Sequence, residues 1–418
     1  MSSANLLTPV MDTSTRSVNF FNGRLLTAED LSREQDANRE SKRLLGQAIG
    51  EGVAYGLEVS KAAGAGLDAR VTVQPGLAIN RNGGLIRLAA AVDLSLVRPQ
   101  NGGAAPSSTA FSECQPFQAG VYVTGSGVYL LTARPARGLE GKAPASGLQS
   151  GAADCNAKYL VDGVQFRLVQ LDFTAAELSD TDRLRNLVAY KCFGIEASRA
   201  FATDPFGVKA EGSTLLDNLR PTRLTDCEVP LAVLHWTATA GISFIDMWSV
   251  RRRLSSRAST GGWLSQFDDR RLSEAEAMFL QFQDQIEAMR LPGNQPEFVV
   301  ATDYFRYLPP AGLLPLTGIK GSRGMDYLRF FGGLKWNPPF FMEGVKLESL
   351  IRSSFSYPPI DSSTKKLIWL YWVRENIQTI NTNTSNFPQA YLVFANGYIP
   401  YQGDARFDLS HANYSNFS

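Results

Sequence analysis

Apolar residues in this chain come in short runs bounded by glycine, proline and asparagine, and this pattern limits the fold more than any other feature of the sequence. With 36 glycines and 21 prolines in 418 residues, about one residue in seven favours a turn. Frequent turns between short apolar runs are typical of short-stranded β structure. We therefore expect a mainly β protein with a few helices, of the α+β class.

Two segments predict helices. Residues 28–47 follow Thr27, a good N-cap, and place Glu29 and Asp30 in the first turn, where the helix dipole favours negative charge. The interior of this helix is almost wholly polar, so it is either solvated or held by neighbours through polar contacts. Residues 273–290 begin with a capping box, Ser273 to Glu276, and carry one apolar stripe. We expect that stripe to pack within its own domain. Its members are Phe279, Phe282, Ile286 and Met289.

Strand candidates dominate the region up to residue 250. They are residues 53–59, 70–74, 77–80, 85–88, 121–123, 128–132, 164–172, 231–236 and 242–248, and residues 184–190 are a short helix or strand. The tetrapeptide Arg81-Asn82-Gly83-Gly84 predicts a hairpin turn, because Asn and Gly accept positive φ.

The composition changes near residue 296, because the last 121 residues hold 23 of the 44 aromatic side chains. Strands are expected there at residues 298–304, 328–331, 367–373 and 391–394. Residues 367–373 show no alternation, so both faces of that strand should be covered. We divide the chain into an N-terminal arm and helix (1–50), a short-stranded antiparallel β domain (51–250), a connector with an amphipathic helix (251–295) and an aromatic-rich β domain (296–418).

The chain offers little for catalysis. Its two histidines, His235 and His411, lie 176 positions apart, and its four cysteines form no C-x-x-C pair. No phosphate-binding loop, nucleophile elbow or metal-binding helix motif is present. We therefore predict no catalytic residue, no cofactor and no metal, and we expect a protein that is not an enzyme. The cysteines are expected to be buried free thiols.

Charge and hydropathy limit the classes of partner that we expect for this chain. Lys and Arg number 41 against 40 Asp and Glu, a net charge of +1, so nucleic acid is not an expected partner. Residues 1–15 lack a basic stretch followed by an apolar core, and no apolar run reaches about 20 residues. We expect neither a secretory leader nor direct membrane insertion.

The C-terminal aromatics supply the candidate partner or ligand contacts, which are Trp336, Tyr357, Trp369 and Trp372. Such rings stack on sugars in carbohydrate-binding modules, but packing in a core or between subunits is the simpler interpretation.

Asp246, His235 and His411 are polar residues with chemical potential, and for each we expect a structural role or exposure to solvent. A pair of carboxylates could serve a cell-wall hydrolase, and Asp246 is the acidic residue to inspect because its neighbours are apolar. We expect it instead to point outward or to pair with one of Arg251–Arg253. His235 is expected to be a hydrogen-bonded core histidine, and His411 to be solvated.

Three early segments carry a family resemblance. Residues 20–31 read F-F-x-G-x-L-L-x-x-x-D-L, residues 52–59 read G-V-x-x-G-L-x-V, and residues 73–78 read V-x-P-G-x-A. This pattern resembles proteins encoded in contractile injection system clusters, which build phage-tail-like particles. The resemblance covers residues 16–95 well and extends to residues 229–253 and 304–316.

The resemblance implies a non-enzymatic structural subunit of such a particle, in the baseplate or a baseplate extension. A cap-end adaptor, or a receptor- or carbohydrate-binding module of the same particle, is the alternative. Partners would be baseplate, sheath or tube proteins and further copies of the chain, with three or six copies matching the usual symmetry. Assembly would take place in the bacterial cytoplasm, with later release or membrane attachment as part of the particle. The family pattern brings no catalytic residues with it.

Overall fold

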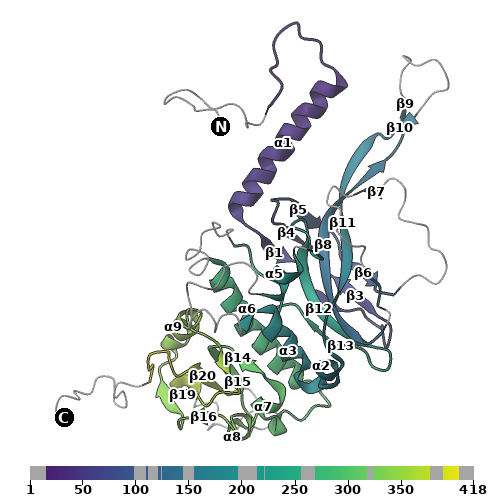
Figure 1. Ribbon diagram of the computed structural model, residues 1–418. Helices are drawn as coiled ribbons and strands as arrows, with labels where there is room; N and C mark the ends of the chain where they lie inside the picture. Colours follow the sequence, from purple (N-terminus) through teal and green to yellow (C-terminus); the bar gives the residue numbers. More distant parts are fainter. Residues whose placement is uncertain are drawn as a thin grey trace, which may run out of the picture.

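A computed structural model describes residues 16–97, 110–111, 121–123, 125–144, 155–195, 214–220, 222–255, 269–317, 323–376 and 389–403. The fold is α+β and mainly β, as the sequence predicts, with several mostly antiparallel sheets. Figure 1 shows a body from which one long helix and one long β-hairpin project.

Three layers build the body up to residue 255. One layer holds two small sheets, with orders β1-β4-β5 and β2-β3-β6. Their strands are β1 (Gly52–Gly56), β2 (Val59–Lys61), β3 (Arg70–Val73), β4 (Gly76–Ile79), β5 (Leu85–Leu88) and β6 (Val92–Ser95). Alternate residues such as Val71 and Val73 are fully buried against the next layer, in a core shared with Leu131 and Leu234.

The middle layer is a larger sheet with the order β11-β8-β12-β13. Its strands are β8 (Gly127–Glu140), β11 (Tyr159–Leu171), β12 (Val229–Thr237) and β13 (Gly241–Asp246), and β7 (Ala110–Phe111) pairs with β8. The third layer packs helices on the opposite face, around Val128, Leu130 and Val233. These helices are α2 (Ala175–Ser179), α3 (Thr181–Cys192) and α5 (Leu215–Leu219). Two short strands, β9 (Ala143–Pro144) and β10 (Cys155–Asn156), pair beyond the end of the β8–β11 hairpin.

The C-terminal part is built on a sheet with the order β15-β20-β19-β16, and β17 also pairs with β19. Its strands are β15 (Ala311–Pro315), β16 (Lys335–Trp336), β17 (Phe340–Met342), β19 (Leu367–Val373) and β20 (Tyr391–Asn396), and β14 (Tyr307–Leu308) pairs with β18 (Ile360–Asp361). The absence of alternation in β19 is explained, because Ile368 and Leu370 are buried in one core and Tyr371 and Val373 in another.

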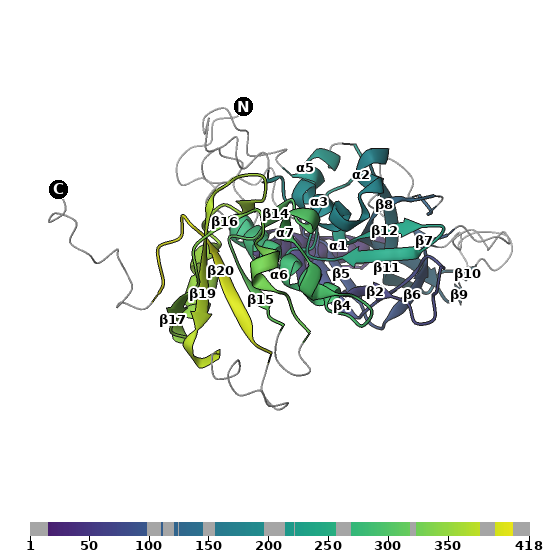
Figure 2. The same ribbon diagram turned by 90° about the horizontal axis from the view of Figure 1, so that it is seen from below.

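Helices cover this sheet and join it to the rest of the body. They are α6 (Asp269–Met289), η2 (Pro296–Phe298), α7 (Ala301–Tyr304), α8 (Tyr327–Phe330) and α9 (Val345–Ser354). The predicted stripe of α6 packs on its own part of the chain, because Phe282 and Ile286 are buried in the C-terminal core. Figure 2 shows α6 between the two β-rich parts, where Met278 shares a cluster with Tyr307 and with Phe193, the C-cap of α3.

Several expectations for local structure are wrong, each for a local reason. Residues 298–304 and 328–331 are not strands: the first holds the end of η2 and α7, and the second forms most of α8, which the Asp326 side chain caps. The expected strand 53–59 is broken, because Leu57 has a φ of 59°. Helix α6 starts at Asp269, so Ser273 lies inside the helix and does not begin it. Residues 121–123 form no strand. For residues 184–190, where a short helix or a strand was expected, the structure has a helix.

The cysteine expectation holds for one described residue and fails for another. Cys192 is free and fully buried, and burial raises the pKa of its thiol to about 12. Cys227 is disulfide-bonded, which contradicts the expectation of free thiols, and its partner is not among the side chains that the structure describes. His411 lies outside the described residues.

Candidate functional site: the N-terminal arm and the β8–β11 hairpin

The most unusual feature of the molecule is helix α1 (Ala28–Ile49), which projects from the body (Figure 1). Its 22 residues span about 33 Å at 1.5 Å per residue. Gly46 is its only buried residue. We call residues 16–49 the arm. A helix with so little burial gains almost nothing from packing within the single chain, so other interactions must hold it.

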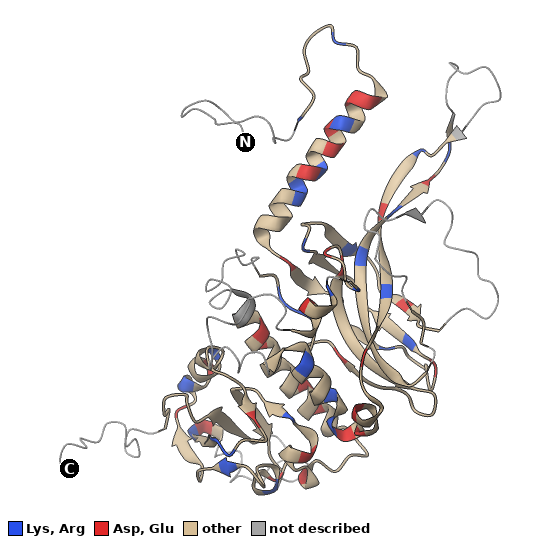
Figure 3. Cartoon of the chain, in the orientation of Figure 1, with Lys and Arg blue, Asp and Glu red and all other residues tan. Residues whose placement is uncertain are grey.

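Local polar contacts hold α1 together. The Thr27 side chain accepts a hydrogen bond from the Asp30 backbone N–H and so caps the first turn. The Asp30 carboxylate in turn accepts a hydrogen bond from the Thr27 backbone N–H, which completes a capping box. Three ion pairs follow along the surface, and Figure 3 shows the alternating charges. They join Arg33 to Glu29 at 2.6 Å, Arg39 to Asp36 at 3.0 Å and Arg43 to Glu40 at 2.6 Å. Exposed ion pairs add little to stability, so the arm is locally marginal.

The far end of the arm exposes a group of apolar side chains, which we call the arm tip. Arg24 fixes the segment before the helix by donating to the Asn19 carbonyl oxygen at 2.7 Å and pairing with Asp30 at 2.7 Å. The apolar side chains are therefore presented on an ordered turn. They are Phe20, Phe21, Leu25, Leu26 and Leu31, each more than half exposed, with Leu25 at 90%.

The base of the arm is fixed by a backbone contact. A Cβ on Gly46 would lie 2.2 Å from the carbonyl oxygen of Gly83, and a Cβ on Gly83 would lie 1.9 Å from the carbonyl oxygen of Arg43. Gly83 sits in the predicted turn between β4 and β5 with a φ of 79°, so both its conformation and its neighbour require glycine. Gln47 Nε2 also donates to the Asn82 carbonyl oxygen at 3.3 Å.

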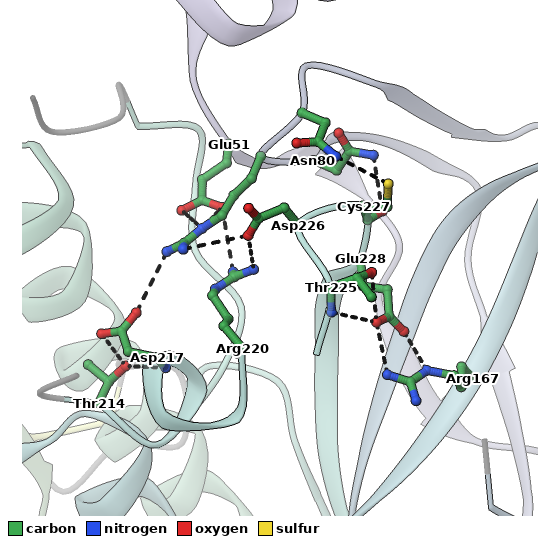
Figure 4. A network of polar contacts seen from close by, with 12 residues as sticks. Glu51, Asn80, Arg167, Thr214, Asp217, Arg220, Thr225, Asp226, Cys227 and Glu228 are labelled. Atoms are coloured by element: carbon green, nitrogen blue, oxygen red, sulfur yellow. Dashed lines mark hydrogen bonds and ion pairs between the residues drawn. The ribbon is translucent and has the colours of Figure 1, made fainter. Parts of the chain in front are cut away.

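An ionic cluster lies directly behind this contact (Figure 4). Arg81 Nε donates to both carboxylate oxygens of Glu51 at 2.8 Å, and Arg220 lies 3.5 Å from the same carboxylate. Asp217 and Asp226 complete the cluster around Arg81. Burial and the neighbouring Arg81 charge lower the pKa of Arg220 to about 10. The cluster therefore joins Glu51, the residue after the α1 C-cap, to the β4–β5 turn and to α5.

A second buried pair lies beside the cluster, between Arg167 of β11 and Glu228 before β12. Arg167 Nε and Glu228 Oε1 are 2.6 Å apart, and Thr132 and Thr225 also donate to this carboxylate. Burial alone would raise the pKa of Glu228, but the bonds from Arg167, Thr225 and Thr132 outweigh it and hold that pKa below its usual value. The pair therefore anchors the hairpin strands to the body.

The end of the β8–β11 hairpin is the second projecting surface (Figure 1). The two strands stay paired out to Glu140 and Tyr159, well beyond the buried residues at the start of β8. We call residues 135–140 and 159–164 the hairpin end. Its exposed apolar side chains are Leu139, Tyr159, Leu160 and Val161. The short strand β7 pairs with β8 at Gly138 and Arg137, so part of this projecting ribbon has a third strand.

The four aromatic residues predicted as contacts fall into two groups. Trp336 and Trp372 both pack edge-on against Tyr327, at 70° and 80° between ring planes. Trp369 packs on Phe340 and Tyr401 at 62°, and Tyr357 joins the same core cluster. All four are half-buried. The structure does not bring them together on one face, and their role as contacts stays a prediction.

Asp246 and His235 both have hydrogen-bonding partners within the fold. Asp246 is fully buried and pairs with Arg185 at 3.0 Å, not with Arg251–Arg253, because β13 directs it toward α3 and α6. Gln281 and the Ser249 backbone N–H donate to it as well. His235 is buried, its Nδ1 lies 2.6 Å from Ser243 Oγ, and burial lowers its pKa.

A cavity beside Arg81, Asp217 and Arg220 measures about 60 Å³, which is smaller than the 300 Å³ or more typical of ligand pockets. The described residues contain no group of three His, Cys, Asp or Glu positioned for a metal. Among those residues, no helix has the length and apolar character needed to cross a membrane.

Sequence reasoning found the helix of the arm and the turn with Gly83, but it missed their contact. Gly46, Glu51, Arg81 and Arg220 carried no signal that would set them apart. The F-F-x-G-x-L-L segment was noted only as part of a folding pattern, although its apolar residues before a polar helix are the feature that marks the arm tip.

Comparisons with known proteins give weak likenesses only. No protein-family model and no curated protein matches the sequence. A crystal structure of TssK is similar at 11% identity and a TM-score of 0.26, covering 67% of this chain and 53% of that chain. The chain thus spans about half of that TssK structure.

Two larger assemblies give comparable values. The TssK-TssF-TssG baseplate subcomplex of the type VI secretion system, seen by cryo-electron microscopy, is similar at 10% identity and a TM-score of 0.24, covering 66% of this chain and 73% of that chain. The baseplate complex of the type VI secretion system is similar at 11% identity and a TM-score of 0.25, covering 67% and 71%.

Proposed function

We propose that this chain is a non-enzymatic structural subunit of a contractile injection system, in the baseplate or a baseplate extension. It would contact a neighbouring subunit through its arm. The observation that carries the proposal is a projecting 22-residue helix with one buried residue, whose far end exposes Phe20, Phe21 and Leu25. Ordered apolar groups held away from the body by a polar helix are costly in water unless a partner covers them.

The segments that carry the family resemblance support this proposal by their places in the fold. Residues 16–95 form the arm and the two small sheets, and residues 229–253 form β12, β13 and the stretch that returns to β1 through the bridge between Arg253 and Val53. Residues 304–316 contain β14 and β15 of the C-terminal part. The resemblance therefore concentrates on the arm and the elements around its base.

The rigid base gives the arm a mechanical role. The Gly46–Gly83 contact and the Glu51–Arg81–Arg220 cluster fix the direction of α1 relative to the body. A partner bound at the arm tip would then be held in a defined place relative to the body. This is what a subunit that keeps its neighbours in register during sheath contraction must do.

A matched pair of substitutions tests the role of the arm. Leu25 is 90% exposed on the arm tip, and Val345 is 86% exposed at the start of α9. The gene cluster would be co-expressed with Leu25→Ser or Val345→Ser, and purified particles would be examined by mass spectrometry and electron microscopy. We expect Leu25→Ser to deplete this chain from particles at least about tenfold, and Val345→Ser to leave it in place. Absence of the wild-type chain from particles overturns the proposal.

A further inference from the structure

We propose that the disulfide bond of Cys227 is a redox-sensitive switch that controls the mobility of the arm. With the bond formed, the base of the arm is held rigidly; with the bond reduced to two thiols, the base loosens and the arm moves more freely. The inference rests on the proposed function, because it concerns the regulation of that same arm. Two observations carry it: the place of the Cys227 sulfur beside the base of the arm, and its access to solvent.

Asn82 connects the sulfur atom of Cys227 to the arm. Its side-chain Nδ2 donates to Cys227 Sγ at 3.3 Å. Its backbone carbonyl oxygen accepts hydrogen bonds from Arg43 Nη1 and Gln47 Nε2 of α1, both at 3.3 Å. Asn82 also directly precedes Gly83, the turn residue that leaves no room for a side chain at the base of the arm. A single residue therefore links the sulfur atom to the contacts that hold α1.

The backbone of Cys227 binds the other end of the same turn (Figure 4). The Cys227 carbonyl oxygen accepts a hydrogen bond from Asn80 Nδ2 at 3.0 Å. Asn80 is buried, and its Oδ1 accepts from the Gly84 backbone N–H at 2.7 Å, which closes the turn. Cys227 thus contacts the β4–β5 turn on both sides of Arg81. Any movement of Cys227 must be transmitted to the turn, and through the turn to α1.

The disulfide fixes Cys227 to a second, distant point of the chain. Cys192 is free, so the bond joins Cys227 to Cys114 or Cys155, both far earlier in the sequence. A crosslink between residues so far apart limits the local opening of the segment that carries it. After reduction, the sulfur atom that Asn82 contacts has no covalent anchor beyond its own backbone. Hydrogen bonds and ion pairs alone then hold the turn in place.

A reductant can reach this bond, and its reduction follows ordinary thiol chemistry. Cys227 and Asn82 are half-buried, whereas Cys192 is fully buried. A thiolate of a dithiol reductant attacks one sulfur of the disulfide, forms a mixed disulfide and releases the other cysteine as a thiol. The second thiol of the reductant then displaces the remaining cysteine. The reductant is oxidised to its own disulfide, and the chain takes up two electrons and two protons.

The switch would distinguish the inside of the cell from the outside. Cytoplasmic thiols are kept reduced, whereas disulfides persist in an extracellular setting. Under the proposed function, the chain joins a particle inside the cell, and the particle is later exposed to oxidants. A mobile arm helps the arm tip to find its neighbour during assembly. Oxidation of Cys227 then fixes the direction of the arm in the finished particle.

Hydrogen exchange of the full-length chain in two redox states tests the switch. The chain would be oxidised with oxidised glutathione or reduced with dithiothreitol, and peptide mapping after differential alkylation would record the state of Cys227. We expect residues 43–49 and 80–84 to exchange at least about fivefold faster in the reduced chain, and to regain protection on reoxidation. Strands β19 and β20 should keep their protection in both states.

Cys227→Ser is the matched control, in which dithiothreitol should have no effect on exchange at residues 43–49. Circular dichroism shows whether this variant is folded, and the comparison of the two states of the wild type decides the question if it is not. Equal exchange in the two states of the wild type overturns the inference. So does a loss of protection that extends to β19 and β20, or a Cys227 that stays a free thiol in the oxidised sample.

The particle assay with Leu25→Ser separates this inference from the proposed function. If exchange does not respond to the redox state but Leu25→Ser still depletes the chain from particles, the switch is wrong and the proposed function stands. If exchange responds as expected but Leu25→Ser leaves the chain in place, the bond controls the arm and the proposed function is wrong.

Discussion

Gly46 of α1 and Gly83 of the β4–β5 turn are in contact through their backbones, with no room for a side chain on either residue. This contact joins a largely exposed helix to the first sheet of the body. The side chains of Arg43 and Gln47 add to it, because each donates to the Asn82 carbonyl oxygen at 3.3 Å, whereas the exposed ion pairs of α1 lie within the helix.

Gly46→Ala should loosen the base of the arm. The new Cβ would lie 2.2 Å from the Gly83 carbonyl oxygen, so the helix or the turn must shift, at a cost of about 1–3 kcal/mol. Hydrogen exchange measured by mass spectrometry should become faster in residues 43–49 while the core strands keep their protection. Ser41→Ala is the control, because this exposed residue of the same helix gains no clash. Unchanged exchange in Gly46→Ala would show that the contact is not needed.

Glu51→Gln should weaken the cluster behind the arm. The substitution leaves Arg81 and Arg220 with less negative charge in a half-buried setting, which we expect to lower the free energy of unfolding by about 1–3 kcal/mol. Urea unfolding followed by tryptophan fluorescence measures the change. The matched control is Glu348→Gln, which breaks an exposed pair with Arg352 and should cost less than about 0.5 kcal/mol. Equal effects of the two substitutions would contradict the role of the cluster.

Acid should destabilise the protein in part through Glu228. Its pKa is lower in the folded chain than in the unfolded chain, so the carboxylate stabilises the fold fully above its unfolded pKa of about 4.3. That stability is lost as the pH falls through the lower, folded pKa. Urea unfolding between pH 3 and pH 7 should therefore show a steeper loss in the wild type than in Glu228→Gln. Parallel profiles would mean that the pair with Arg167 does not shift the carboxyl group.

Cys192 should be inert in the native protein. The thiol is fully buried, and burial raises its pKa to about 12, so almost no reactive thiolate is present at pH 8. Iodoacetamide followed by peptide mass spectrometry should leave Cys192 unmodified in the native chain and modify it in urea. Rapid native labelling would show that α3 opens in solution.

Elements with strong local signals could be predicted from the sequence, whereas elements that depend on contacts between distant residues could not. Thr27 and the early acidic residues predict α1, and its observed capping box confirms that prediction. The strand prediction for residues 328–331 is wrong, because a short aromatic run has no reliable period and the Asp326 cap decides for a helix.

The candidate site shows the same division. Asn82 and Gly83 predict the turn, but only the fold brings Gly83 to Gly46 and Arg81 to Glu51. Asp246 was expected to point outward or to pair with an arginine nearby in sequence, whereas packing of α3 against β13 supplies Arg185, 61 positions away. The exposure of Leu25 and Val161 could not be foreseen, because apolar residues in a sequence look the same whether they fill a core or face a partner.

Photo-crosslinking from the arm tip tests the central claim most directly. A photoreactive amino acid would replace Leu25 in one sample and the equally exposed Val345 in the other, within the co-expressed gene cluster. We predict that position 25 crosslinks to a second polypeptide in purified particles and that position 345 does so at background level. If position 25 yields only crosslinks within its own chain, or none above the level of position 345, the arm is not an assembly contact.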